Sequence, residues 1–335
     1  MNTTLKLLIV FVASSALAQT YTVTDLGTLG SNSTGAFSEA YCINASGQIA
    51  GQSTASSRRV TDPAFLYNDG IMTSLGTLGG EYASAHGINT SGQIAGYSTL
   101  RDGTYRAFLY TGGQMTALPT FGGAYGAAYA LNDSGQVVGV SALASSDQHA
   151  FLYTNGHMTD LGTLGGDTST ASGINNRGVV VGYSYNQVGN FLGFIYRNGR
   201  MTALGTLGGT WSSATAINDL NQITGQAYTH NNFEAHAFRL FNGTMTDLGT
   251  LGHFYSSGLA INNSGTVVGY ATIADNSDHA FISTNGGLIQ DLNDMIPAGT
   301  GWVLAEATAI NDSGQIVGYG SVHGQEHAFL LAPAE

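Results

Sequence analysis

The stretch HAFLYTNGHMTDLGTLGG at residues 149–166 is followed, eight residues later, by the pair Ile174-Asn175. Both parts recur through the chain, together with a Ser-Gly-Gln-x-x-Gly-Tyr string, at a usual spacing of 43 or 44 residues. A period of this length is typical of stacked or circular repeat proteins. The step from an aliphatic residue to Asn occurs seven times, at Ile43, Ile88, Leu131, Ile174, Ile217, Ile261 and Ile310.

Each repeat contains four short stretches of β character. Two of them are joined by an Asn-x-x-Gly string such as Asn89-Thr90-Ser91-Gly92, and Asn and Gly both tolerate the backbone of a tight hairpin turn. The other two are joined across Asn155-Gly156 and its equivalents. Four strands in each repeat make one propeller blade. The sequence therefore predicts an all-β, seven-bladed β-propeller of four-stranded blades.

The two ends of the chain predict how the ring closes. The last repeat stops near Phe329 and lacks its Met-Thr-x-Leu-Gly strand, whereas Tyr21–Gly27 is such a strand with nothing before it. We expect the N-terminal strand to pair into the last blade, because closure removes two edge strands. The strand that ends at Ile-Asn then lies innermost, along a central channel. Residues 19–335 form a single domain in this interpretation.

Residues 1–18 resemble a secretory signal peptide rather than part of the fold. Lys6 precedes an apolar run at Leu7–Val12, and Ala16-Leu17-Ala18 has the pattern of a cleavage site. The apolar run is too short to span a bilayer. The sequence therefore predicts a secreted protein, extracellular or periplasmic, without membrane insertion.

The charge of the chain limits its partners. Lys6 is the only lysine, and 21 carboxylates oppose nine basic residues. Nucleic acid binding requires clustered Lys and Arg, so nucleic acid is a poor candidate. A neutral polysaccharide or a cell-surface ligand is compatible with this charge. The one cysteine, Cys42, occupies a position of small residues and is expected to be buried, and we expect a monomer.

The recurring strings resemble a known family. His149-Ala150-Phe151, His236-Ala237-Phe238, His279-Ala280-Phe281 and His327-Ala328-Phe329, joined to the Met-Thr-Asp-Leu-Gly and Ile-Asn-x-Ser-Gly-Gln strings, are similar to the HAF-type extracellular repeats of bacterial secreted and surface proteins. This resemblance covers essentially the whole mature chain and implies export and a propeller-like fold. It implies no activity. Three repeats lack the His, which favours a structural role for it; they have Pro63, Arg106 and Leu192 instead.

Function is expected where single repeats depart from the pattern. Six residues before the Ile-Asn step, five repeats have an aromatic residue, and Trp302 lies near this position in the last repeat. Aromatic rings suit a half-exposed site that stacks on sugar rings. The alternative is that they pack between blades. The candidates at this position are Phe37, Tyr82, Tyr125, Trp211, Tyr255 and the nearby Trp302.

Four residues before the step, only the first and last repeats have a carboxylate, Glu39 and Glu306. These repeats become neighbours when the ring closes, and they also contain the longest loops. A carboxylate pair could perform the acid–base chemistry of glycoside hydrolysis, could bind Ca²⁺, or could be two solvated acids. The long loops could instead only hold the junction together.

Two residues before the step, blades one to three have Tyr41, His86 and Tyr129. Such groups could move protons in a polysaccharide lyase, or they could simply line the channel. No basic residue beside them is evident that would neutralise a uronate.

Taken together, the sequence predicts a secreted β-propeller binding module for carbohydrate or a cell-surface partner. Its binding surface would be the face at which the Leu-Gly-Thr-Leu-Gly-Gly loops lie, called the Gly-Gly face below. One alternative is a polysaccharide-active enzyme, a hydrolase or lyase, with Glu39 and Glu306 as catalytic groups. The other alternative is a structural surface or matrix protein. No cofactor or metal site is predicted, although Ca²⁺ stays possible.

Overall fold

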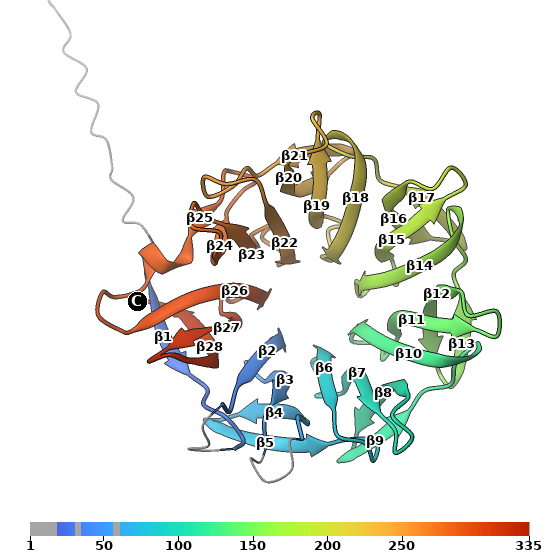
Figure 1. Ribbon diagram of the computed structural model, residues 1–335, viewed down its shortest axis with the longest axis horizontal. Helices are drawn as coiled ribbons and strands as arrows, with labels where there is room; N and C mark the ends of the chain where they lie inside the picture. Colours follow the sequence, from blue (N-terminus) through green and yellow to red (C-terminus); the bar gives the residue numbers. More distant parts are fainter. Residues whose placement is uncertain (1–18, 31–34, 56–60, 335) are drawn as a thin grey trace, which may run out of the picture.

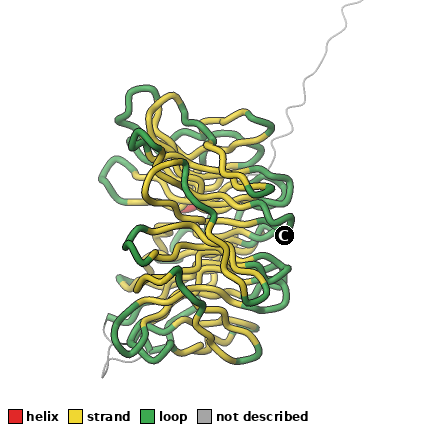
Figure 2. Tube along the Cα trace, turned by 90° about the vertical axis from the view of Figure 1, so that its right-hand side faces the viewer, coloured by secondary structure: helices red, strands yellow, loops and turns green. Residues whose placement is uncertain are grey.

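The computed structural model describes residues 19–30, 35–55 and 61–334, and the expected signal segment at 1–18 lies outside them. Seven antiparallel sheets of four strands each are arranged as blades around a central axis (Figure 1). Seen from the side, the ring is a thick disc with strands in the middle and loops on both faces (Figure 2). The predicted seven-bladed propeller is therefore confirmed.

The first six blades each use four consecutive strands, ordered from the axis outward. Blade one consists of β2 (Ser38–Ile43), β3 (Ile49–Ser53), β4 (Ala64–Asn68) and β5 (Ile71–Gly76). Blade two consists of β6 (Ala83–Ile88), β7 (Ile94–Thr99), β8 (Tyr105–Thr111) and β9 (Gln114–Ala117). Blade three consists of β10 (Gly122–Leu131), β11 (Val137–Leu143), β12 (Gln148–Thr154) and β13 (His157–Asp160). Blade four consists of β14 (Gly165–Ile174), β15 (Val180–Asn186), β16 (Phe191–Arg197) and β17 (Arg200–Ala203). Blade five consists of β18 (Gly208–Ile217), β19 (Ile223–Thr229), β20 (Ala235–Phe241) and β21 (Thr244–Asp247). Blade six consists of β22 (Ser256–Ile261), β23 (Val267–Thr272), β24 (Asp278–Ser283) and β25 (Gln290–Asp291).

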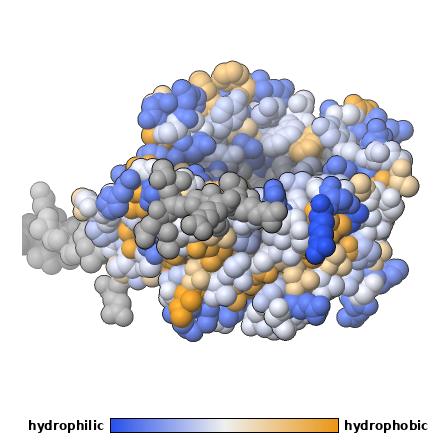
Figure 3. Space-filling model, turned by 60° about the horizontal axis from the view of Figure 1, so that its bottom comes forward, coloured by the Kyte–Doolittle hydropathy of each residue, from blue (hydrophilic) through white to orange (hydrophobic). Residues whose placement is uncertain are grey.

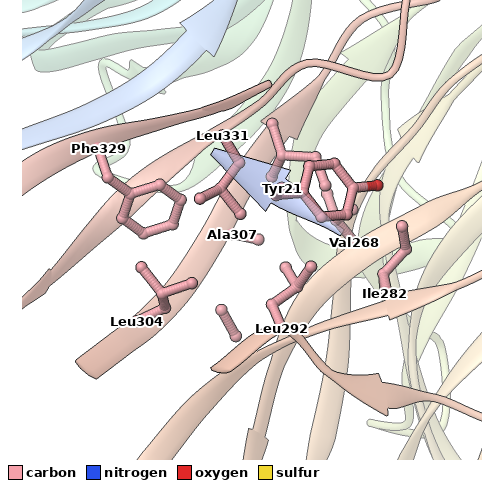
Figure 4. Close-up of a cluster of buried hydrophobic side chains, with 10 residues drawn as sticks. Tyr21, Val268, Ile282, Leu292, Leu304, Ala307, Phe329 and Leu331 are labelled. Atoms are coloured by element: carbon pink, nitrogen blue, oxygen red, sulfur yellow. The ribbon is translucent and has the colours of Figure 1, made fainter. Parts of the chain in front are cut away.

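The seventh blade joins the two ends of the chain. It contains β26 (Trp302–Ile310), β27 (Ile316–Val322) and β28 (Gln325–Pro333), and its outermost strand is β1 (Tyr21–Asp25). Tyr21 is 2 % exposed and packs in a core formed by blades six and seven (Figure 4). The longer loop before β26 folds into a short 3-10 helix, η1 (Leu292–Met295), whose Leu292 enters the same core. The predicted closure is therefore confirmed.

The Ala-Phe string supplies the core of every blade. The Phe of each copy is at most 1 % exposed. The Met of each Met-Thr string packs against these cores from the outer strand, as Met158 does in blade three. The seven buried side chains are Phe65, Phe108, Phe151, Phe194, Phe238, Phe281 and Phe329.

The Asn of the Ile-Asn step connects the blades into a closed ring. Asn175, for example, accepts hydrogen bonds from Arg177 N and Val179 N and so shapes its own hairpin turn. Its Nδ2 donates to the backbone carbonyl of Asn218 in the next blade at 3.0 Å. All seven copies make this interblade bond, at 2.8–3.2 Å, and the last one runs from Asn311 back to Asn44. We call this mouth of the channel the Asn face.

The His of the HAF string is structural. In blade five, His236 Nδ1 lies 2.9 Å from Asp247, which belongs to the Met-Thr-Asp-Leu-Gly strand beside it. His149, His279 and His327 form the same pair with Asp160, Asp291 and Asp25. The other three repeats lack both partners together. Where Pro63, Arg106 and Leu192 replace the His, Ser74, Ala117 and Ala203 replace the Asp.

Candidate functional site

The channel lining is set by a bulge in every innermost strand. The register of β10 against β11 shifts between Ala128 and Ala130, so Tyr129 has no partner in the ladder. An equivalent shift occurs in all seven blades. A bulge redirects the extra side chain out of the regular alternation. The seven bulged residues all line one cavity on the axis: Tyr41, His86, Tyr129, Ser172, Thr215, Leu259 and Thr308.

The Gly of the Ser-Gly-Gln-x-x-Gly-Tyr string makes this bulge possible. A Cβ added at Gly139 would lie 2.0 Å from the carbonyl oxygen of Ala127 on the bulged strand. The equivalent distance is 1.9–2.0 Å at each of the other six copies. A side chain of any size is therefore excluded there, which explains why this Gly occurs in every repeat.

The channel cavity has a volume of about 510 Å³ and lies between the bulged residues. This volume is within the range of small-molecule sites. A separate polar cavity of about 280 Å³ lies at the Asn face, where Asp133, Asn176 and Asp219 continue the ring of side-chain to backbone hydrogen bonds. Figure 3 shows that the ring is hollowed at its middle.

Blades one to three form a continuous group of aromatic rings, which we call the aromatic platform: Tyr41, Tyr82, His86, Tyr97, Tyr105, Tyr125 and Tyr129. Tyr41 stacks on His86 with ring centroids 4.6 Å apart, and His86 stacks on Tyr97 at 5.1 Å. At the outer end, Tyr105 contacts Tyr82 and Tyr125, and it is 37 % exposed. The platform thus extends from the channel cavity to the surface of the Gly-Gly face.

The platform is electrically neutral near neutral pH. Burial lowers the pKa of His86 to about 4, and its Nε2 lies 2.9 Å from Ser84 Oγ. Burial also raises the pKa of Tyr97 and Tyr129 above the ordinary phenol value. These groups therefore present ring faces and hydroxyl groups, not charges.

A second aromatic group lies on blades four and five. Phe191 stacks on Tyr183 at 4.5 Å and on Trp211 at 5.4 Å, with an angle of 8° between the planes of Phe191 and Trp211. Tyr228 continues the series from Trp211 at 5.4 Å. Tyr183 lines the channel cavity, so this group also connects the surface with the channel.

The two glutamates lie on neighbouring blades, as the closed ring predicts. Glu39 accepts hydrogen bonds from the Tyr41 hydroxyl and, at 2.5 Å, from Gln52 Nε2 on the next strand. Burial raises the pKa of Glu306, and the negative charges of Asp278 and Glu39 raise it further, whereas a hydrogen bond from Tyr319 opposes the shift. Glu306 lines both the channel cavity and a cavity of about 560 Å³ at the junction of blades six and seven.

The structure brings some of the predicted ligand-binding residues together and separates others. Tyr41, Tyr82, His86, Tyr125 and Tyr129 all belong to the aromatic platform.

The other predicted residues lie elsewhere. Trp211 belongs to the second aromatic group, and Tyr255 is 40 % exposed beside blade five. Phe37 is half-buried ahead of β2. Trp302 packs edge-on against Phe329, in the core of the closing blades and away from the channel lining, because β26 begins far from the axis.

Sequence reasoning missed Tyr97, Tyr105, Tyr183 and Phe191. Tyr97 and Tyr183 follow the bulge glycine, and each lies opposite the residue four before the Ile-Asn step. That opposite residue is Ser84 or Thr170, which leaves room for a ring. The signal was the Gly-Tyr pair in the repeat, although only the register shows which side of the strand the Tyr occupies.

Among the residues that the structure describes, no group of three or more His, Cys, Asp or Glu side chains is placed to hold a metal ion. No helix of the described part of the chain is long and apolar enough to cross a membrane.

Comparison with known proteins shows the fold alone. No family model and no curated protein matches the sequence. Among solved structures, the chain is similar to a puromycin hydrolase (TM-score 0.57, 12 % identity, 89 % of this chain and 52 % of that chain). It is also similar to TolB from Acinetobacter baumannii (TM-score 0.53, 12 % identity, 90 % of this chain and 64 % of that chain). A third similar structure is an acylaminoacyl peptidase from Pyrococcus horikoshii (TM-score 0.54, 12 % identity, 87 % of this chain and 52 % of that chain). The chain thus spans about half to two thirds of the lengths of these structures.

Proposed function

We propose that this propeller is a carbohydrate-binding module whose binding surface runs from the Gly-Gly face into the channel cavity. The observation that supports it best is the aromatic platform, in which a half-exposed ring at the surface is continuous with rings in a cavity of about 510 Å³. Ring faces pack well against the apolar faces of sugars, and Tyr hydroxyls supply polar contacts. The platform is also neutral, which suits a ligand rich in hydroxyl groups.

A second proposal concerns export. We propose that residues 1–18 direct the chain out of the cytoplasm and that the propeller meets its ligand outside the cell or in the periplasm. The motivation is the short apolar run that follows Lys6, ahead of Ala16-Leu17-Ala18. Mass spectrometry of the secreted protein would test this, because a mature chain beginning at Gln19 is expected and retention of the leader would contradict it.

The binding proposal is tested by retention on immobilised polysaccharides, followed by titration of the oligosaccharide that is retained best. Tyr105→Ala should weaken binding about fivefold, since one stacked ring contributes about 1 kcal/mol. Phe241→Ala is the matched control, because Phe241 is 38 % exposed on an outer strand and Tyr105 is 37 % exposed. Folded protein that no polysaccharide or glycan array retains would contradict the proposal.

Glycoside hydrolysis is the second candidate. The raised pKa of Glu306, beside the charge of Glu39, is the pairing that a general acid and a carboxylate partner require. Release of reducing ends from a bound polysaccharide would support this candidate. If Glu306→Gln leaves such activity intact, the assignment is wrong.

A further inference from the structure

The channel cavity has a distinctive distribution of charge. Of the side chains that line it in the described part of the chain, only Glu306 is an acid, and none is Lys or Arg. His86 also lines it, and burial lowers the pKa of His86 to about 4, so that this ring is neutral at neutral pH. One carboxyl group therefore faces an otherwise neutral cavity.

The neutral part of the lining favours a hydrogen-bond donor with positive charge. The rings of Tyr41, Tyr129 and Tyr183 line the cavity, and aromatic faces attract cations, most strongly where water is displaced. Thr308 Oγ1 donates to the carbonyl of Ala40 at 2.7 Å. Thr215 Oγ1 likewise donates to the backbone. Because these two hydroxyl protons are already used, their oxygens can act only as acceptors toward a ligand.

Among the residues that the structure describes, the surroundings of Glu306 are also short of positive charge. The groups that act on it come from its own junction and from both adjacent blades, and each is an acid or a phenol: Tyr319, Asp278, Glu39, Glu326 and Tyr270. Burial and three neighbouring carboxylates thus disfavour ionisation of Glu306, in spite of the Tyr319 hydrogen bond. A cation in the cavity would relieve both effects.

We propose that the channel cavity binds the ammonium group of an amine-bearing saccharide, such as a glucosamine chain, with Glu306 as the counter-ion and Tyr41, Tyr129 and Tyr183 as the surrounding rings. This inference rests on the proposed carbohydrate function and names its ligand class. The groove that Glu306 shares at the junction of blades six and seven gives the remaining sugars a route toward the surface.

The experiment compares three probes by calorimetric titration: a glucosamine hexamer with trimethylated nitrogens, the neutral N-acetylglucosamine hexamer, and tetramethylammonium. The trimethylated probe keeps its charge at every pH, so any pH dependence belongs to the protein. It has no N–H to donate, so it tests the charge alone, and it should bind at least about tenfold more tightly than the N-acetylated hexamer through the rings and the carboxylate. Its affinity should rise as pH increases through the raised pKa of Glu306, because the ionised carboxylate is the form that attracts it.

Glu306→Gln should remove both the preference for charge and the pH dependence, and Glu306→Asp should retain both in weakened form. Asp294→Asn is the matched control, because Asp294 is exposed on η1 and changes the net charge equally without lining the channel. Circular dichroism establishes that each variant is folded.

The outcomes separate the two proposals. Equal binding of the charged and N-acetylated hexamers, or an unchanged preference in Glu306→Gln, overturns the ammonium site and leaves carbohydrate binding in place. Binding of neither hexamer overturns the carbohydrate function, and binding of tetramethylammonium alone overturns the saccharide as the ligand.

Discussion

The bulge glycine offers the sharpest test of how this repeat builds its channel. In Gly139→Ala, the new Cβ would lie 2.0 Å from the Ala127 carbonyl oxygen and 2.8 Å from Ala128 Cα. Ordinary contacts begin near 3.4 Å, so the bulged strand must move by about 1.4 Å. Overpacking of this kind costs about 1–3 kcal/mol, and two disturbed backbone hydrogen bonds add about 1 kcal/mol each. We therefore expect a loss of about 3–5 kcal/mol in the free energy of unfolding.

Gly126→Ala is the matched control within the same blade. Gly126 is also buried and has no positive φ, and its nearest neighbour, Thr120 Cγ2, lies at an ordinary 3.4 Å. Both variants gain about 0.4–1 kcal/mol from the stiffer unfolded chain, so the difference between them isolates the collision. For a domain of about 300 residues, the midpoint of thermal unfolding should fall by roughly 5–8 °C in Gly139→Ala alone. The midpoints are measured by Trp fluorescence and calorimetry. Equal midpoints for the two variants would refute the reasoning.

Three further predictions concern the scaffold. A double-mutant cycle on His236 and Asp247 should give a coupling of about 0.5–1 kcal/mol, since Asp247 is 43 % exposed. The hydrogen bond to Asp247 raises the pKa of His236, and the hydrogen bonds from His236 and Gly249 N lower the pKa of Asp247 despite its burial. The coupling should therefore be largest between about pH 4 and 6.5, where both groups are charged, and should fade outside that window. A coupling that is independent of pH would contradict the assignment of the ion pair. Asn175→Ala should cost about 1–3 kcal/mol in denaturant unfolding, because it removes the interblade bond to the Asn218 carbonyl and the side-chain acceptor of Arg177 N and Val179 N. Asn176→Ala at the exposed rim should cost less, and equal losses would argue against the ring. Burial raises the pKa of Cys42 to about 12, so a maleimide should label it only at the rate of unfolding, and fast labelling of folded protein would contradict its burial.

The fold was predictable because the repeat shows its own strand boundaries. Seven copies place the four strands, and the incomplete last copy identifies Tyr21–Asp25 as the missing strand of the seventh blade. The position of Glu39 and Glu306 on neighbouring blades followed from closure of the ring alone. The His–Asp pairs were also within reach, since both partners are present in four repeats and both absent in three.

The site was only partly predictable, because its geometry depends on a bulge. Positions two before the Ile-Asn step were selected as channel residues, and Tyr41, His86 and Tyr129 do line the cavity. Tyr97 was missed because its side depends on the register across from the bulged strand. Trp302 was placed near the mouth by counting residues, but the longer loop sets the start of β26 outward and directs this ring into the core.

The bulge also explains how a symmetric ring acquires a directional site. The glycine and the ladder fix the backbone identically in all seven blades, so the bulged position is free to vary without cost to the fold. Blades one to three use this freedom for rings, whereas Ser172, Thr215 and Thr308 present hydroxyl groups. Glu306 adds one carboxyl group on blade seven, next to blade one, where the aromatic platform begins. A ligand with an apolar face and a positively charged end would thus fit in one orientation only. A propeller with seven identical repeats could not select one orientation of a ligand.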